Sequence, residues 1–412
     1  MNANYQPVQR QERVEILDLL RGFALLGIFM VNMPLMNAPF LVEMAEFSLW
    51  TDPVNEKARW IIDFFFTGKF YTLFSMLFGI GFYFFMKKAD ESGNSVLGLF
   101  KRRLGWLLAI GVLHVVLLWY GDILVFYALF GFLMLLFRKK SNKSLLIWAG
   151  CILLLPVLFS TLLVVFIKLA LSVPEVAEDM LAGFEATAIH MQQLFDHLIE
   201  VYATGSFGEI VSARLEEYKN ILGGILFFFP NVLAMFLVGM VFARIRVFED
   251  IEANKPFFRK LLIYSLPAAL FGCWLYATYA AQSSYIMFEW SLVLTIAGLG
   301  FGGPAMTFVY ISLIAFCYQK SYFKTLSKAI QKTGRMALTN YLMQSVVATT
   351  IFFSYGLGLY GQVDIVQGMI LVTGIYVVQV IWSHFWLKHY RFGPMEWLWR
   401  TLTYGKKQKM KL

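Results

Sequence analysis

A charged residue lies inside the first long apolar stretch of this chain. Arg21 falls within ILDLLRGFALLGIFMVNM (residues 16–33), which is otherwise almost entirely apolar. Asp18 precedes it by one helical turn and shares its face, and Asn32 returns to nearly the same face about three turns later. Because a charge near the bilayer interior costs roughly 2.5–3.5 kcal/mol, this stripe should face other helices or a watery cavity. Arg21 could bind a phosphate or carboxylate there, or form a structural ion pair.

A histidine inside a later apolar stretch is the candidate for proton transfer. His114 stands in LGWLLAIGVLHVVLLWYGDIL (104–124), near the middle of a membrane span or slightly outside it. The pKa of an imidazole is easily moved, which suits a general base. Asp122 follows two turns later and about 80° round the helix, so it should approach His114 only loosely. The alternative is a histidine hydrogen-bonded between helices.

The segment KTGRMALTNYLMQS (332–345) resembles half of an anion site. Gly334 and Arg335 are expected at a helix start on the cytoplasmic side, where free backbone N–H groups and the helix dipole favour an anion. Asn340 and Gln344 are four residues apart and should share a face inside the membrane. Basic clustering at the cytoplasmic side would explain the nearby lysines equally well, but it does not explain Asn340 and Gln344.

The segment RFGPMEWLWRTLTYG (391–405) predicts a cytoplasmic amphipathic helix. Pro394 suits a helix start, and Glu396 and Arg400 are four residues apart. The tryptophans of this segment are typical of residues at a membrane interface. A structural role is favoured over a catalytic one.

The elements that must position these residues follow from composition. The chain has 412 residues, of which 59% are hydrophobic and 15% charged. Such a chain predicts a single all-α domain over residues 1–412, a polytopic helical bundle in a lipid bilayer. The net charge of +9 comes from short basic clusters between apolar spans, which argues against a nucleic-acid partner.

About ten transmembrane helices are expected, with both termini cytoplasmic. Lys and Arg gather in alternate gaps between the spans, and these gaps should lie inside the cell with both termini. The spans are predicted at 15–33, 69–86, 104–120, 122–137, 144–170, 221–243, 259–281, 301–319, 337–356 and 366–387.

Two long gaps are expected on the outer side. Residues 34–68 could hold an interfacial helix around Asn55 to Phe66. Residues 172–219 have helical amphipathic patterning and carry nine acidic against two basic groups, which predicts an extracytoplasmic helical insertion. His190 and His197 lie in this insertion; a solvated helical face is favoured over a metal site, because no compact ligand motif accompanies them.

Residues 284–300 are apolar but contain Glu289, and GLGFGGP (298–304) should break any helix that follows. A re-entrant or kinked segment fits the charge alternation better than a separate span. The three cysteines, Cys151, Cys273 and Cys317, lie in apolar spans and are expected as small buried residues, with no metal site. Motifs typical of soluble hydrolases, ATPases and dehydrogenases are absent from the sequence.

Several of these segments resemble the successive motifs of a known family. EILDLLRGFALLGIFMVNM, FYTLFSMLFGIGF, LHVVLLWYGDILVFYALFG, GRMALTNYLMQS and RFGPMEWLWRTLTYG look like those of the YeiB-like bacterial membrane proteins, a domain of unknown function. The resemblance implies a bundle of roughly ten helices in the bacterial cytoplasmic (inner) membrane. That family is more distantly similar to transmembrane acyltransferases of the heparan N-acetyltransferase type, through LDLLRG and GRMALTNYL.

The acyltransferase similarity implies an acyl-CoA donor on the cytoplasmic side and an acceptor on the far side. By analogy Arg21 and Arg335 would hold the phosphates of CoA, and His114 would be the base. We therefore expect an acyltransferase acting on an envelope glycan, a lipid or a small metabolite. The alternatives are a transporter or flippase of an anionic solute or lipid, and a non-catalytic membrane scaffold.

Overall fold

The computed structural model describes residues 14–44, 47–91, 96–223, 229–284 and 286–412. Their regular structure is helical, apart from one isolated β-bridge between Tyr390 and Lys411. The helices are α1 (Glu15–Asn37), η2 (Phe40–Glu43), α2 (Pro53–Phe65), α3 (Lys69–Glu91), α4 (Val96–Leu117), α5 (Leu124–Phe137), α6 (Asn142–Ala170), α7 (Pro174–Thr204), α8 (Phe207–Gly223), α10 (Pro230–Arg244), α11 (Lys255–Tyr279), η4 (Ala280–Gln282), α12 (Trp290–Ala297), η5 (Gly298–Gly302), α13 (Gly303–Tyr318), η6 (Ser321–Phe323), α14 (Lys324–Arg335), α15 (Ala337–Phe352), α16 (Ile365–His389) and α17 (Pro394–Tyr404).

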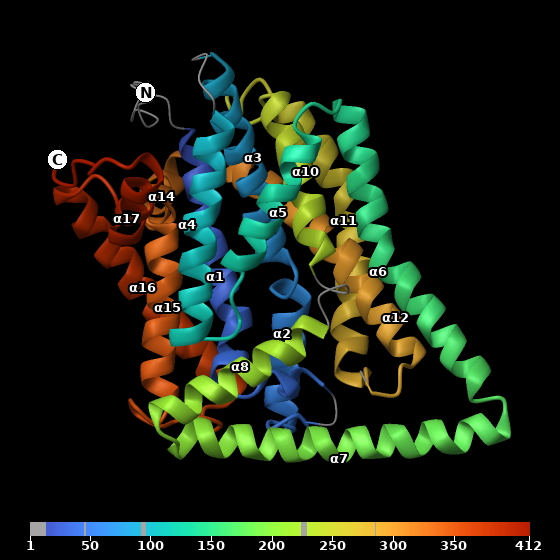
Figure 1. The fold of residues 1–412 in the computed structure, drawn as a ribbon. Coiled ribbons are helices and arrows are strands. Elements are labelled where there is room, and N and C mark those ends of the chain that lie inside the picture. Colours follow the sequence, from blue (N-terminus) through green and yellow to red (C-terminus); the bar gives the residue numbers. More distant parts are fainter. Residues whose placement is uncertain (1–13, 45–46, 92–95, 224–228, 285) are drawn as a thin grey trace.

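The helices form a bundle whose two ends differ (Figure 1). The start of α1 and the whole of α17 lie at one end, at the top of the view, and we call this the inner end after the orientation that the sequence predicts. The long helix α7 lies across the opposite end, which we call the outer end.

The expected all-α membrane character is confirmed. Among the described residues, six helices are long and apolar enough to cross a bilayer: Glu15–Asn37, Pro53–Lys87, Asn142–Ala170, Lys255–Gln282, Trp290–Tyr318 and Ile365–His389. The apolar helices Leu124–Phe137 and Pro230–Arg244 are shorter. Apolar side chains face outward along α6 and α16, as expected where a helix meets lipid rather than water.

The glycine-rich segment 298–304 does not break its helix, contrary to expectation. A continuous helical stretch runs from Trp290 to Tyr318 and passes through a π-helical turn at Gly298–Gly302. The glycines bring this stretch close to α11, because a Cβ on Gly302 would lie 2.6 Å from the carbonyl carbon of Gly272. Small residues at a crossing let two helix backbones approach, so the glycines here serve packing. Residues 284–300 therefore include the start of a long helix, which contradicts the re-entrant alternative but not the kinked one.

Other boundaries shift in ways that matter for the site. The predicted span 104–120 is α4, which already ends at Leu117. The predicted span 221–243 is not one described helix, since α8 ends at Gly223 and α10 begins at Pro230; residues 224–228 lie outside the described residues. The predicted span 337–356 ends at Phe352. The helix expected around Asn55 to Phe66 is α2, whose start is capped by the Asp52 side chain.

The expected insertion at 172–219 consists of α7 and α8 at the outer end. A carboxylate of α8 ties it to neighbouring segments: Glu217 Oε1 accepts the backbone N–H of Phe40 at 2.9 Å, and Glu217 Oε2 accepts the Tyr202 hydroxyl. The Glu217 side chain is completely buried, and this burial raises its pKa to about 8. The folded chain therefore holds a proton on Glu217 at neutral pH.

The raised pKa of Glu217 predicts a pH-dependent stability. An unfolded chain releases this proton near its ordinary pKa of 4.5, so raising the pH from 5 to 8 destabilises the folded state. In Glu217→Gln the melting temperature should fall less than in wild type across this interval, since the amide cannot ionise. Thermal melts of the detergent-solubilised protein measure the difference. The exposed neighbour Glu216→Gln is the control and should follow wild type; parallel curves for Glu217→Gln and wild type would refute the prediction.

Candidate active site

His114 lies in the last turn of α4, where the helix ends and the chain turns back. The carbonyl of His114 accepts the backbone N–H groups of both Leu118 and Trp119, at 2.9 and 3.0 Å, which closes the helix. The turn returns Asp122 to the imidazole, with Asp122 Oδ2 at 2.9 Å from His114 Nδ1. The expected loose approach of Asp122 is therefore wrong, because that estimate continued α4 as a straight helix to residue 122. Asp122 Oδ1 also accepts the Val125 N–H at 2.7 Å, which fixes the carboxylate at the start of α5.

A serine completes the array from a distant helix. Ser345 Oγ of α15 lies 2.8 Å from His114 Nε2. The side chains of His114 and Asp122 are fully buried, and Ser345 is 0% exposed. Tyr341 lies one turn before Ser345, with its ring centre 5.2 Å from that of His114. Ser345 stands within the segment 332–345, but nothing local distinguishes it from other helical serines, because its partner is 231 residues away.

The array Asp122–His114–Ser345 has the order of an acid, a base and a nucleophile. A carboxylate at Nδ1 favours the tautomer with its proton on that nitrogen and stabilises the imidazolium that forms later. Nε2 can then accept the proton of a hydroxyl at hydrogen-bond distance. Inside an apolar bundle this arrangement suits proton transfer coupled to attack by an oxygen.

Asn340 and Gln344 join helices and do not line an open path. Asn340 Nδ2 donates to the Thr333 carbonyl and to Ser383 Oγ, both at 3.0 Å. Gln344 Nε2 donates to Gln379 Oε1 at 3.0 Å, and Gln379 Nε2 donates to the Asn340 carbonyl at 2.9 Å. All of these side chains are buried. The network ties α15 to α16 between the inner end and His114.

A cavity of about 450 Å³ opens at the inner end, between α1, α14 and α16. It has the size of a small-molecule site. Lys332 Nζ lies 3.0 Å from His384 Nδ1 on its wall, and Arg335 Nη2 donates to the Arg391 carbonyl at 3.4 Å. Its lining consists of Glu15, Asp18, Thr325, Lys328, Ala329, Gln331, Lys332, Arg335 and His384. Two expected residues, Asp18 and Arg335, therefore share one cavity, and His114 is not in its lining.

Arg21 and Asn32 do not line this cavity. Arg21 Nη1 pairs with Asp18 Oδ1 at 2.6 Å, and of these two residues only Asp18 lines the cavity. Asn32 is half-buried farther along α1, and its side chain makes no hydrogen bond within the described residues. The expected stripe of three residues is thus divided into an ion pair beside the cavity and a separate asparagine.

Gly334 and Arg335 end a helix rather than begin one. They belong to the last turn of α14, and α15 begins at Ala337. Gly334 allows α14 to pack closely against α1, since a Cβ at this position would lie 1.9 Å from the Asp18 carbonyl oxygen. The expected anion at the start of α15 is the chain's own Glu396, which lies on α17.

Glu396 meets the start of α15 with both oxygens. Oε1 accepts the backbone N–H groups of Leu338 and Thr339, at 2.7 and 3.1 Å. Oε2 accepts the Thr339 hydroxyl at 2.6 Å. A carboxylate at a helix N-terminus satisfies free N–H groups and the dipole together. The predicted amphipathic helix 391–405 is present as α17, and Glu396 docks it.

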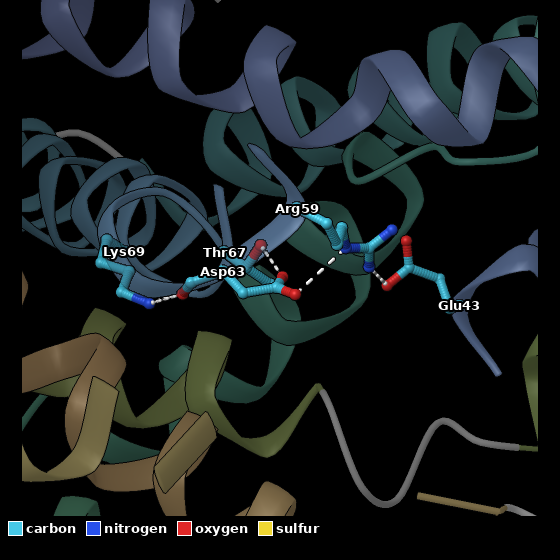
Figure 2. Close-up of polar contacts among 5 residues, drawn as sticks. All are labelled: Glu43, Arg59, Asp63, Thr67 and Lys69. Carbon is cyan, nitrogen blue, oxygen red and sulfur yellow. Dashed lines mark hydrogen bonds and ion pairs between the residues drawn. The ribbon is translucent and has the colours of Figure 1, made fainter. Parts of the chain in front are cut away.

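Figure 2 shows a second, partly buried polar cluster, formed by residues of η2, α2, the turn after α2 and the start of α3, which no sequence pattern indicated. Arg59 bridges Glu43 and Asp63, and Arg59 Nε lies 3.1 Å from Asp63 Oδ2. Thr67 Oγ1 donates to Asp63 Oδ1 at 2.9 Å, and Lys69 Nζ donates to the Asp63 carbonyl at 2.6 Å. Two acids and two bases balance one another here. The cluster accounts for the buried Lys69 as a brace of this turn.

The remaining candidates are placed away from these sites. His190 and His197 are exposed on α7. No group of three or more His, Cys, Asp or Glu residues that could hold a metal ion occurs in the part of the chain that the structure describes. Cys273 is buried as expected and Cys317 is half-buried, but Cys151 is exposed on the outward face of α6, contrary to expectation.

Comparisons with known proteins place the chain among bacterial relatives. A family described as a protein of unknown function, DUF418, matches residues 242–406. The uncharacterized protein YxaH of Bacillus subtilis is 34% identical, over 98% of this chain and 97% of the relative. The uncharacterized 39.9 kDa protein of Bacillus acidopullulyticus is 29% identical over 97% and 96%, and the uncharacterized protein YeiB of Escherichia coli is 29% identical over 95% and 96%. No solved structure matches the chain.

The docking of Glu396 predicts a stability effect. Glu396→Ala removes the acceptor of two backbone N–H groups and one hydroxyl, and should lower the free energy of unfolding by roughly 1–3 kcal/mol. Burial raises the pKa of Glu396, and Glu396→Gln keeps an acceptor oxygen, so the glutamine variant should lose less. Thermal melts compare both with Glu252→Ala, a control at an exposed glutamate. An alanine variant as stable as the control contradicts the role given to Glu396.

Proposed function

This chain belongs to the YeiB-like family, and from that premise we propose that it is a membrane-embedded acyltransferase. In this proposal an acyl group moves from a cytoplasmic acyl-CoA to an envelope glycan or lipid acceptor on the far side. The observation that carries the proposal is the Asp122–His114–Ser345 array, in which a carboxylate, an imidazole and a hydroxyl stand in sequence inside an apolar bundle. The resemblance to transmembrane acyltransferases supports the same reaction class.

The orientation in the proposal follows the basic clusters. Ten crossings of the cytoplasmic membrane of a bacterium are assigned to α1, the α2–α3 pair, α4, α5, α6, α10, α11, the stretch from α12 to α13, α15 and α16. The basic connections after α5 and α10 lie at the same end as α17 in Figure 1. The positive-inside rule then makes the inner end cytoplasmic, with both termini. The cavity beside Arg335 would face the compartment that contains acyl-CoA.

The donor would bind by its phosphates. Lys328, Lys332 and Arg335 line the inner cavity, and Arg is suited to bidentate contact with a phosphate. Ser345 is eight residues beyond the start of α15, about 12 Å along the helix axis. The network of Asn340 and Gln344 lies on this path, so delivery of the acyl group requires α15 and α16 to separate there.

The chemistry would use both ends of the imidazole. Ser345 Oγ attacks the thioester carbon and its proton passes to His114 Nε2, while Asp122 stabilises the resulting imidazolium. The carbon–sulfur bond breaks, and the thiolate of CoA leaves with that proton. The acyl ester on Ser345 then passes to an acceptor hydroxyl, whose proton moves through His114 back to Ser345.

Transport of an anionic solute or lipid has less support. It would rest on an open polar path and on a helix broken at 298–304. Asn340 and Gln344 bond to neighbouring helices, and the helix from Trp290 to Tyr318 is continuous. A scaffold role has no specific observation in its favour. Uptake by proteoliposomes without consumption of acyl-CoA would favour a transporter.

Ser345 should carry the acyl group. Incubation of the purified protein with radiolabelled acetyl-CoA should leave label on Ser345, found by mass spectrometry of its peptide. Ser345→Ala and His114→Gln should lower transfer or hydrolysis by roughly 10²–10⁴-fold, because the nucleophile or its base is lost. Ser160→Ala is the control, a buried serine that bonds only within α6. Full activity in Ser345→Ala would exclude the covalent step, and full activity in His114→Gln would exclude the relay.

Arg335 should bind the donor rather than take part in the chemical step. Arg335→Ala should weaken acyl-CoA binding about tenfold, the loss of one charge-assisted contact of 1.4 kcal/mol or more. Isothermal titration or equilibrium dialysis measures the dissociation constant, and high salt should weaken wild-type binding as well. Lys406→Ala, at an exposed lysine of the tail, is the control. Binding unchanged in Arg335→Ala, or absent in wild type at millimolar acyl-CoA, overturns the assignment of the cavity.

A further inference from the structure

A completely buried arginine lies under the outer surface of the bundle. Arg214 of α8 is 0% exposed, and its Nη1 donates to the Val116 carbonyl at 2.6 Å. Val116 is in the last turn of α4, two residues after His114. The other two nitrogens, Nε and Nη2, have no hydrogen-bond partner within the described residues. They form one edge of the guanidinium, the edge that pairs side-on with two oxygens of a carboxylate or phosphate.

Among the described residues, no carboxylate contacts this guanidinium. Within the described residues Arg214 forms no ion pair at 4.0 Å or less. Glu217, one turn later on α8, directs its oxygens to the Phe40 N–H and the Tyr202 hydroxyl instead. Its burial raises its pKa to about 8, so it is mostly neutral at pH 7. A buried cation without a counter-ion is strongly disfavoured, which points to an anion supplied from outside the chain.

The surroundings contain a second donor without a partner. Arg214 lies against Phe353, with its guanidinium carbon 5.7 Å from the ring centre. Phe353 packs with Tyr202 and Tyr360, whose ring centres are 4.7 and 5.6 Å from its own. The hydroxyl of Tyr360 is buried and has no partner within the described residues. Two separate polar groups of one aromatic cluster therefore lack partners.

We propose that the Nε–Nη2 edge of Arg214 binds an oxyanion, a carboxylate or a phosphate group, in the outer cap formed by α8 and the aromatic cluster. The site is separate from the acyl-CoA cavity, since Arg214 is held to the outer end of α4 while the cavity lies at the inner end. It does not depend on the proposed acyl transfer. The oxyanion has two sources, a soluble molecule or the headgroup of an anionic lipid.

The test uses the full chain in nanodiscs of phosphatidylcholine and follows its melting temperature. One arm adds sodium phosphate or succinate at constant ionic strength, and the other replaces part of the lipid with phosphatidylglycerol. A rise of several degrees in the first arm identifies a soluble oxyanion, and a rise only in the second identifies a lipid headgroup. No rise in either arm overturns the proposal.

Variants show whether the rise in melting temperature depends on Arg214. Arg214→Leu should abolish the rise, and without anion it should melt no lower than wild type, because it removes an uncompensated buried charge. Arg214→Lys keeps the charge but loses the two-point contact, and should need at least tenfold more anion for the same rise. Tyr360→Phe should weaken the rise, and Lys219→Gln, on the exposed face of α8, should leave it unchanged. A wild-type rise in melting temperature in Arg214→Leu refutes the site. If the leucine variant does not fold, a wild-type rise in Arg214→Lys at the same anion concentration refutes it.

Discussion

Polar groups between the helices of this chain must find their partners inside the protein, because the interior of a bilayer offers no water to replace them. This constraint organises most of the structure. Asp122 returns to His114, Gln344 finds Gln379, and Arg59 joins two carboxylates at the turn after α2. The contacts of Asp122, of Gln344 and of Arg59 with Glu43 each join separate elements, whereas Arg59 and Asp63 lie one turn apart on α2. The polar minority of residues therefore fixes which apolar helices lie beside one another.

The same constraint separates groups that are satisfied from groups that await a ligand. The start of α15 is a site where an anion is favourable, and Glu396 already supplies it. The charge cluster around Arg59 is balanced, because its two basic residues are paired with two carboxylates, so it braces the fold (Figure 2). Arg214 differs, because two of its donors meet no acceptor in the described chain. In our proposal, this contrast marks Arg214 as a ligand-binding residue.

Three sites follow one another along the bundle in our interpretation. A basic cavity lies at the inner end, the His114 array lies at the outer end of α4, and Arg214 holds the carbonyl of Val116 just beyond it. A donor that enters from inside and an acceptor that arrives from outside could meet at such an array. The network of Asn340 and Gln344 keeps α15 and α16 together between the first two sites. In the proposed reaction its opening would control access to Ser345.

The sequence by itself determined the features that depend on composition and local period. The all-helical membrane class, the helix at 391–405 and the helical character of the insertion at 172–219 follow from apolar runs and amphipathic spacing. His114 was identifiable because a lone histidine in an apolar span is unusual. Only the tertiary structure decided its partners, because Asp122 reaches it through a turn that ends α4 early, and Ser345 lies on another helix. Likewise the local sequence from Gly298 to Gly302 predicts a helix break. In the structure these glycines allow close packing against α11, and the helix continues through them. Helical period shows which residues share a face; which faces meet depends on contacts between residues hundreds of positions apart.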